Sequence, residues 1–198
     1  MYKVFFNQKP IILSTQIIKN DDSCPLFYIK FSVADKIISA LKKKSISSVV
    51  LYHPKNEKLE MHFNKLFPIV EAAGGLVINK LNQYLFIYRN KKWDLPKGRM
   101  RKNEMIIDAA VREVEEETSV RDLIVKKQLP ITYHIFKRNR KYKLKKTYWY
   151  LMETSYNGQL VPQLTEGIEK AVWKNKNEID LLIKNAYKNI EVLLNQIL

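Results

Sequence analysis

The stretch that decides the fold runs from Gly98 to Val120 and reads GRMRKNEMIIDAAVREVEEETSV. We expect a helix from about Met105 to Thr118. At 3.6 residues per turn, Glu113 shares one face of this helix with Glu116 and Glu117, three and four positions later. A second face is apolar and carries Ile107, Ala110, Val111 and Val114. The pattern therefore predicts a helix that is anchored on one side and carries clustered carboxylates on the other.

The carboxylate face is unusual because its glutamates have no lysine partner four positions later. Like charges one helical turn apart repel by a few tenths of a kcal/mol per pair. Of Glu113, Glu116 and Glu117, only Glu117 has a cationic residue four positions later, Arg121. Hard carboxylate oxygens suit Mg²⁺ or Mn²⁺ better than Zn²⁺. A metal site is thus favoured over the alternative, a solvated acidic helix face.

The same stretch resembles the signature of the Nudix hydrolases. That signature is a glycine, five residues, a glutamate, seven residues, and then Arg-Glu-aliphatic-x-Glu-Glu-x-Gly-aliphatic. The matching positions are Gly98, Glu104, Arg112, Glu113, Val114, Glu116, Glu117 and Val120. The sequence departs from it at Ser119, where the family has glycine. If this position takes a left-handed helix cap, serine costs roughly 1 kcal/mol without removing a ligand.

The resemblance implies an α/β fold, the Nudix α/β/α sandwich with a mixed sheet, over residues 69–198. It implies bound Mg²⁺ or Mn²⁺ and substrates in which a nucleoside diphosphate is linked to another group. The implied metal ligands are the Gly98 carbonyl, Glu113, Glu116, Glu117 and, from a later loop, Glu166. Glu169 and Glu153 compete with Glu166 for that last place.

The resemblance also assigns three catalytic roles. Glu113 is a ligand or the base that activates water, Arg112 holds Glu113 in position, and Glu104 is an outer carboxylate. Carboxylates of this kind can remove a proton from the attacking water, while bound metal neutralises phosphate charge.

A finer resemblance concerns the substrate. Trp93 followed by Leu95-Pro96-Lys97-Gly98 is similar to the diadenosine polyphosphate and diphosphoinositol polyphosphate branches of the family, and Lys97 would face a phosphate. The substrate-binding residues expected on this basis are Arg89, Trp93, Lys97, Tyr133, Lys145, Lys146 and Tyr148. For Trp93, Tyr133 and Tyr148, packing in the core or on a sheet face is the competing interpretation.

The resemblance does not cover residues 1–68. Their pattern predicts a small N-terminal α/β extension of unknown role. Pro68 marks the expected junction with the Nudix domain, residues 69–198. The extension's expected strands are Tyr2–Phe6, Ile11–Leu13, Phe27–Phe31 and Val49–Tyr52. Its two expected helices carry Val33, Ile37, Ile38 and Leu41, and Leu59, His62, Phe63 and Leu66.

After the junction the pattern predicts further strands and one closing helix. The strands are Leu76–Ile78, Tyr84–Arg89, Leu123–Val125, Ile131–Lys137, Thr147–Glu153 and Lys170–Trp173. The closing helix places apolar residues from Ile179 to Ile197 at spacings of three and four.

Composition limits the partners. The 198 residues carry a net charge of +15, with seven basic residues between Lys137 and Lys146, which argues for an anionic partner. That block is either a solvated hairpin tip or a phosphate-recruiting surface. The single cysteine, Cys24, and the lack of a long apolar stretch lead us to expect a soluble, unexported, cytoplasmic protein with no membrane partner. A homodimer stays open.

Three functions remain. The first is a hydrolase of dinucleoside polyphosphates or similar polyphosphorylated small molecules. The second is an RNA 5′-end pyrophosphohydrolase or decapping-type enzyme, for which the positive charge is the argument. The third is a non-catalytic Nudix-like binding protein, against which the complete set of glutamates speaks.

Overall fold

The computed structural model describes residues 4–18 and 21–198, and the chain divides into two compact units. The first unit comprises the residues up to Val70 together with Tyr133–Lys146. The second comprises Glu71–Thr132 and Thr147–Leu198. The basic block at 137–146 therefore belongs to the same unit as the N-terminal segment, although it lies in the middle of the sequence.

The second unit is built on a sheet whose strand order is β11-β6-β5-β10-β9, with β7 paired to β6 and β8 to β5. Its strands are β5 (Ile69–Asn79), β6 (Tyr84–Arg89), β7 (Lys92–Asp94), β8 (Lys97–Arg99), β9 (Leu123–Arg138), β10 (Lys141–Thr154) and β11 (Ile168–Lys174). Its helices are α3 (Ile106–Thr118), α4 (Lys176–Ile183), α5 (Lys188–Leu194) and the short 3₁₀ helix η2 (Leu164–Glu166).

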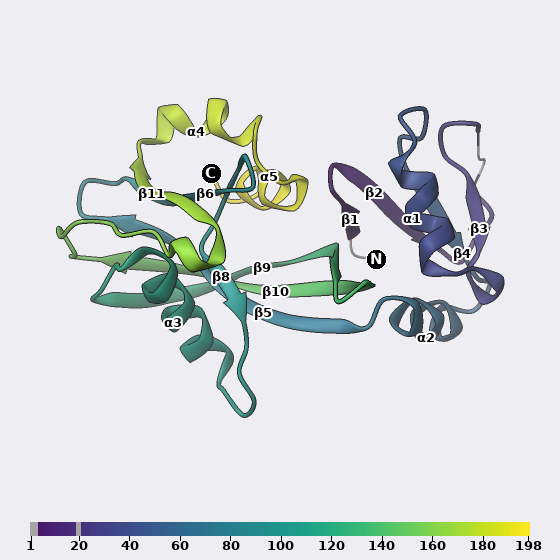
Figure 1. Cartoon of the computed structure of the whole chain (residues 1–198), viewed down its shortest axis with the longest axis horizontal. Helices are drawn as coiled ribbons and strands as arrows, with labels where there is room; N and C mark the ends of the chain where they lie inside the picture. Colours follow the sequence, from purple (N-terminus) through teal and green to yellow (C-terminus); the bar gives the residue numbers. More distant parts are fainter. Residues whose placement is uncertain (1–3, 19–20) are drawn as a thin grey trace. The chain divides into compact units, whose positions relative to one another are not determined.

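Helices cover both faces of this sheet because successive strand residues point to opposite sides. Leu76 and Trp149 belong to the apolar cluster under α4 and α5. Their neighbours Val77 and Tyr150 belong to the cluster under α3. Figure 1 shows α3 on one side of the strands and α4 and α5 on the other. The predicted α/β/α sandwich is confirmed.

The first unit contains a sheet with the order β9-β1-β2-β4-β3. Its elements are β1 (Val4–Phe6), β2 (Lys9–Ser14), β3 (Leu26–Tyr28), the 3₁₀ helix η1 (Ile29–Phe31), α1 (Ala34–Lys42), β4 (Val49–Tyr52) and α2 (Asn56–Leu66). Ile11 and Leu51 face the apolar sides of α1 and α2, which supply Ile37 and Phe63. Sheet and helices thus enclose one core.

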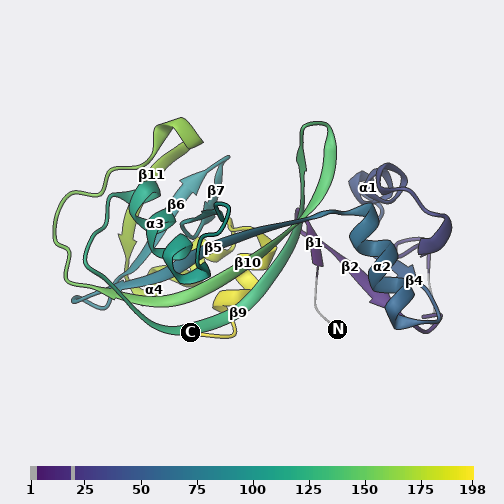
Figure 2. The same ribbon diagram turned by 90° about the horizontal axis from the view of Figure 1, so that it is seen from below.

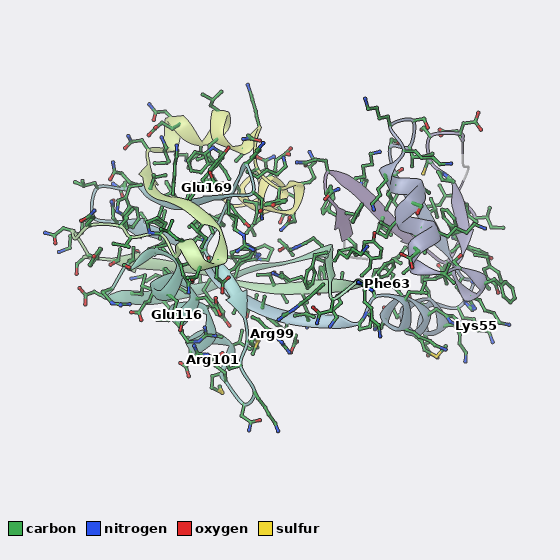
Figure 3. All side chains as sticks on the ribbon, viewed as in Figure 1. Lys55, Phe63, Arg99, Arg101, Glu116 and Glu169 are labelled. Atoms are coloured by element: carbon green, nitrogen blue, oxygen red, sulfur yellow. The ribbon has the colours of Figure 1, made fainter. Side chains whose placement is uncertain are left out.

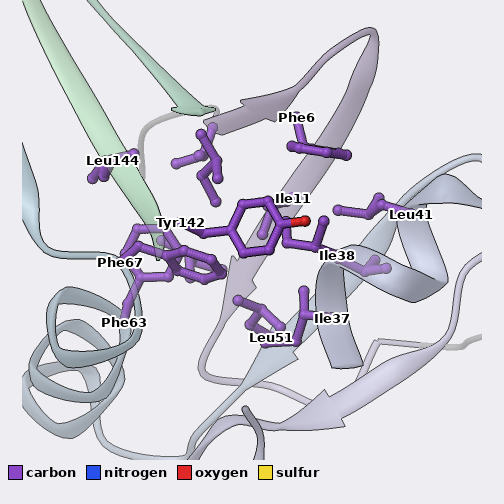
Figure 4. Close-up of a cluster of buried hydrophobic side chains, with 14 of the residues drawn as sticks. Phe6, Ile11, Ile37, Ile38, Leu41, Leu51, Phe63, Phe67, Tyr142 and Leu144 are labelled. Carbon is purple, nitrogen blue, oxygen red and sulfur yellow. The ribbon is translucent and has the colours of Figure 1, made fainter. Parts of the chain in front are cut away.

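The tip of the basic hairpin contributes to that core. Strands β9 and β10 are long and paired (Figure 2), and they turn at Asn139 and Arg140, which both have positive φ. Tyr142 and Leu144 are buried, and Figure 4 shows both among the apolar side chains of the first unit. The block is therefore not a purely solvated tip, since its two apolar positions fill a core while its lysines and arginines surround them.

Two strand and helix predictions in the first unit were partly wrong. The expected strand Phe27–Phe31 ends at Tyr28, and the next three residues form η1. Val33 precedes α1 and is 59% exposed, so it is not part of that helix's apolar face. Tyr2, at the start of the first expected strand, lies outside the described residues.

Two predictions in the second unit also need correction. The expected strands Leu123–Val125 and Ile131–Lys137 are one continuous strand, β9. Pro130 lies inside it, where β9 is the last strand of the second unit's sheet and a missing N–H is tolerated. The single expected closing helix is two helices, α4 and α5, because the chain turns between Ile183 and Lys188. Among residues 4–18 and 21–198, no helix is long and apolar enough to cross a membrane.

Candidate active site

Helix α3 positions the carboxylates and ends where the sequence departs from the signature. Ser119 has φ 63°, the left-handed conformation, and its backbone N–H donates to the Glu115 carbonyl at 2.9 Å. The expected left-handed cap is therefore confirmed, with serine carrying the strain that glycine would avoid. The Ser119 hydroxyl donates to the Val161 carbonyl at 3.4 Å.

The two faces of α3 are both largely buried. Ala110 and Val114 pack in the apolar cluster of the sheet, whereas Ile107 is 46% exposed and does not take part in the predicted anchor. Glu113 and Glu117 are 6% and 0% exposed, so they point into the protein and not toward bulk solvent. A solvated acidic helix face is thereby excluded for these two residues.

Arg112 connects three of the glutamates. Its Nε and one terminal nitrogen donate to both oxygens of Glu104, at 2.6 and 2.8 Å. Its other terminal nitrogen donates to Glu113 at 2.6 Å and to Glu116 at 2.9 Å. Arg101 adds a second cation, donating to Glu116 at 2.8 Å. Because a planar guanidinium can hold several carboxylates at fixed angles, Arg112 determines how these groups face one another.

Glu117 lies at the opposite side of the cluster, against strand β8. The Lys97 backbone N–H donates to its Oε2 at 2.8 Å, and an Arg89 terminal nitrogen lies 3.5 Å from Oε1. The same Arg89 nitrogen lies 3.9 Å from Glu166. Arg89 thus links Glu117 to Glu166, the last residue of η2, which precedes β11.

Gly98 lets the helix approach β8. A Cβ built at this position would collide with the Glu113 carboxylate group. The Glu113 side chain therefore lies directly over the Gly98 backbone, and any larger residue would displace it. This close approach explains why a glycine is needed here without appeal to an unusual φ.

The environment shifts the pKa values of these carboxyl groups in opposite directions. Hydrogen bonds from Arg112 lower the pKa of Glu104 to about 2. Burial raises the pKa of Glu113, with Arg112 opposing the rise and Glu116 and Glu166 adding to it. Burial raises the pKa of Glu117 to about 7, against the lowering effect of Lys97. Glu113 and Glu117 are therefore carboxylates whose negative charge is poorly compensated by the protein alone.

The Glu117 shift predicts a pH-dependent stability in metal-free buffer. Its folded-state pKa, about 7, lies above the ordinary 4.5, so between these values the native state holds a proton that the unfolded chain releases. The free energy of unfolding should therefore fall as pH rises from about 4.5 to 7, by up to about 3 kcal/mol from this group. Thermal melts in EDTA from pH 5 to 8 test this. Glu117→Gln should flatten the dependence, whereas Glu115→Gln should keep the wild-type slope.

The donor set fits a divalent cation. Ion pairs join Arg89, Arg101 and Arg112 to five carboxylates, which leaves a formal charge of −2. The five are Glu104, Glu113, Glu116, Glu117 and Glu166. All donors are hard oxygens, as Mg²⁺ and Mn²⁺ prefer. In the part of the chain that the structure describes, no three acidic, histidine or cysteine side chains converge on a point by themselves. The backbone carbonyl of Gly98 would have to complete such a site.

Three acidic residues were considered as the metal ligand from a later loop, and Glu166 has the most suitable position among them. It is within ion-pair distance of Arg89, and its charge acts on Glu113. Glu153 instead pairs with Lys126 at 3.1 Å. Glu169 is exposed and is drawn well away from Arg101 and Glu116 in Figure 3. The geometry favours Glu166 among the three, and its role as a ligand remains a prediction.

The expected substrate-binding residues lie in varied surroundings. The Lys97 side chain is 4% exposed and its ammonium contacts Asp94 at 2.5 Å, so it is not presented to solvent. Trp93 is half-buried and packs edge-on to Tyr88. The Tyr148 hydroxyl donates to Glu71 at 2.8 Å. The other expected residues, Tyr133, Lys145 and Lys146, belong to the first unit, and their contact with substrate remains a prediction.

Sequence reasoning missed Asp94, Arg101 and the Arg99 carbonyl. Asp94 is buried, binds the Lys97 ammonium and accepts the Leu95 backbone N–H at 2.9 Å. The Arg99 carbonyl accepts a hydrogen bond from Arg112 at 3.2 Å. The spacing of Asp94 and Lys97, three residues apart in a short loop, was a usable signal. No such signal indicated the pair of Arg101 and Glu116, because these two residues lie far apart in the sequence.

Comparisons with known proteins agree with this geometry. A family model of the NUDIX domain matches residues 68–196. An RNA pyrophosphohydrolase of Pelagibacter ubique (strain HTCC1062) is 29% identical over 157 residues, covering 70% of this chain and 99% of that protein. The structure of a C. elegans Ap4A hydrolase in a binary complex matches with a TM-score of 0.50 and 21% identity, covering 64% of this chain and 93% of that chain. At this identity the structural match shows a common fold.

Proposed function

Because the chain belongs to the NUDIX family and is a phosphoanhydride hydrolase of that family, we propose that it cleaves a polyphosphorylated small molecule with Mg²⁺ or Mn²⁺. The proposed substrates are dinucleoside polyphosphates or similar nucleotide conjugates. We place the enzyme in the cytoplasm, where the thiol of its single cysteine would stay reduced.

One observation carries the proposal of metal dependence. Glu113 and Glu117 are buried carboxylates with raised pKa values, in a group of ion-paired residues with a formal charge of −2. Burying such charge is unfavourable unless a cation neutralises it. A divalent cation would also supply the positive charge that anionic phosphates need in order to approach five glutamates.

The residues of the chain divide the chemistry among them. When bound, the metal neutralises phosphate charge and makes the attacking water more acidic. Glu113 is the proposed base, since its raised pKa brings it closer to neutral pH, where a carboxylate accepts a proton most effectively. Arg112 keeps the Glu113 carboxylate in place, with Glu104 holding the far side of the guanidinium. Glu116, Glu117 and the Gly98 carbonyl are the proposed metal ligands, joined by Glu166.

Two observations favour the RNA 5′ end as a second candidate substrate. A curated relative, matched over nearly its whole length, is an RNA pyrophosphohydrolase. The net charge of +15 also suits a polyanion longer than a dinucleotide. Against it, the residues between Lys137 and Lys146 include one aromatic side chain, Tyr142, and that ring is buried and cannot stack on a base.

A substrate panel separates the two candidates. Dinucleoside polyphosphates, diphosphoinositol polyphosphates, nucleoside triphosphates and 5′-triphosphorylated RNA would each be assayed with Mg²⁺ and with Mn²⁺. Glu113→Gln, purified in parallel, identifies turnover by contaminating enzymes. We expect the highest kcat/KM for a dinucleoside polyphosphate. Preferential release of pyrophosphate or phosphate from RNA would instead establish the second candidate, and turnover equal to that of Glu113→Gln throughout would contradict both.

Metal binding should also be visible without substrate. Millimolar Mg²⁺ or Mn²⁺ is expected to raise the melting temperature of the wild type, because a ligand that binds only the native state stabilises it. The double variant Glu116→Gln with Glu117→Gln should lose this rise, and Glu153→Gln should keep it. Activity should vanish in excess EDTA. A melting temperature that does not respond to metal, or full turnover in EDTA, would rule out the proposed site.

A further inference from the structure

The first unit carries a cluster of aromatic rings at one edge of its sheet, made of residues to which no role has been assigned above. Strands β3 and β4 are parallel and neighbouring (Figure 1), so Tyr28 and Tyr52, their last residues, pair at the same edge. Phe31 follows β3 in η1, and His53 follows β4 before α2. The carboxyl edge of parallel strands is where ligands bind most often in open α/β sheets.

These rings, which we call the ring cluster, form a continuous series: Phe31, Tyr28, His53 and His62, with Tyr52 at the side. Ring centroids lie 5.3 Å apart from Phe31 to Tyr28, 5.5 Å from Tyr28 to His53 and 5.6 Å from His53 to His62. Tyr28 and His53 are stacked, with 20° between their planes. Such spacing is that of interacting aromatic groups.

One end of the ring cluster is held by the protein and the other is open. His53 is buried, and its Nδ1 accepts the Lys55 backbone N–H at 3.1 Å. Phe31 is 75% exposed and Tyr28 is 37% exposed. The exposed surface of these two rings does not stabilise the fold, because it is not removed from water. Groups of exposed apolar side chains mark binding surfaces.

Lysines of η1 and α2 lie near two members of the ring cluster, Phe31 and His62. The Lys30 ammonium lies 5.2 Å from the centroid of Phe31. Burial lowers the pKa of His62, and the positive charges of lysines on α2 and η1 lower it further. At 100° per residue, Lys58 and Lys65 lie within about 60° of His62 on α2, whereas the acidic residues of that helix lie more than about 130° away. The acidic residues of α2 are Glu57 and Glu60.

We propose that the first unit binds single-stranded nucleic acid at the ring cluster, with bases against Tyr28 and Phe31 and phosphates against Lys30, Lys58 and Lys65. Proteins that bind single strands combine stacking rings with a cationic track in this way. A membrane surface fits less well, because the outward face of α2 presents lysines beside Met61 and lacks the continuous apolar stripe of an interfacial helix. The proposal does not depend on which substrate the second unit hydrolyses.

The test measures binding of a 3′-labelled oligouridine RNA of about 12 nucleotides by fluorescence polarisation, with the full chain. The RNA carries a 5′-hydroxyl, so it offers no phosphoanhydride bond to the active site. Tyr28→Ala with Phe31→Ala should raise the Kd at least about tenfold, as expected for loss of one or two stacked bases. The triple variant Lys30→Gln, Lys58→Gln and Lys65→Gln should also raise the Kd, and should reduce the slope of log Kd against log salt by about 2.

A matched control separates location from net charge. Lys44→Gln, Lys176→Gln and Lys184→Gln remove the same number of exposed lysines elsewhere and should leave the Kd near the wild-type value. The circular dichroism spectrum and the melting temperature of every variant should match those of the wild type, which shows that both units are folded. Equal effects of the two lysine triples would overturn the proposal. So would an unchanged Kd on loss of both rings, or binding of the wild type to anionic phosphatidylserine vesicles and not to RNA.

Discussion

Glu113→Gln is expected to lower turnover by roughly 10²- to 10⁴-fold, the usual contribution of a general base, with the fold intact. Glutamine keeps the size of the side chain and can still contact Arg112, but it cannot accept a proton from water. The Glu113 carboxylate lies over Gly98 and 2.6 Å from an Arg112 nitrogen, so a neutral replacement fits the same space. Steady-state turnover with saturating metal, together with the melting temperature, gives the result.

Glu115→Gln is the matched control for this prediction. It makes the same chemical change two residues along the same helix, but Glu115 points to Arg121, 3.4 Å away, and not toward the cluster. Turnover of this variant should stay close to wild type. If Glu115→Gln were as damaging as Glu113→Gln, the assignment of the base would be wrong.

Arg112→Ala should have the second largest effect, lowering kcat/KM by about 10²-fold or more, because a displacement of about 1 Å in a reacting group can cost that much. It should also destabilise the protein by roughly 1–3 kcal/mol, since Glu104 and Glu113 would lose a half-buried partner. Arg112 holds the pKa of Glu113 down. The acid limb of the pH–rate profile should therefore move to higher pH in the variant.

Arg112→Lys distinguishes positioning from charge. Lysine keeps the positive charge but cannot contact Glu104 through two nitrogens and Glu113 through a third. We expect it to restore much of the stability and leave kcat well below the wild-type value. Recovery of full turnover by lysine would show that Arg112 supplies only charge. An unshifted pH–rate profile in Arg112→Ala would show that Glu113 is not the group that titrates.

The helix and its carboxylate face could be predicted because they depend on local spacing. Residues three and four apart share a face in any α-helix, so Glu113, Glu116 and Glu117 had to lie together once Ile106–Thr118 became helical. The left-handed cap at Ser119 was expected from the resemblance, which places a glycine at this position, and φ 63° bears it out. The charge partners did not follow as directly. Only residues four positions later were considered, whereas Arg112 pairs with Glu116 from four positions earlier.

The predictions that failed concern breaks and continuations that local pattern does not specify. The apolar spacing from Ile179 to Ile197 is compatible with one helix or with two. The chain turns between them because Asn185 forms two hydrogen bonds there: its side-chain amide donates to the Lys91 carbonyl, and its backbone carbonyl accepts from the Trp93 N–H. Strand β9 continues through Lys126, Lys127 and Pro130 because it pairs with β10. The apolar content of its own residues does not determine its length.

The sequence by itself therefore determined the local part of the candidate site: a helix whose glutamates share one face and an arginine beside the proposed base. Each depends on covalent spacing and helical period, which are local. Only the tertiary structure decided which charges are buried. It pairs Lys97 with Asp94 inside the protein, leaves Glu117 without exposure, and places Tyr142 and Leu144 in the core of the first unit. Burial is set by contacts between segments distant in sequence, and the free energy of a charge depends on that burial.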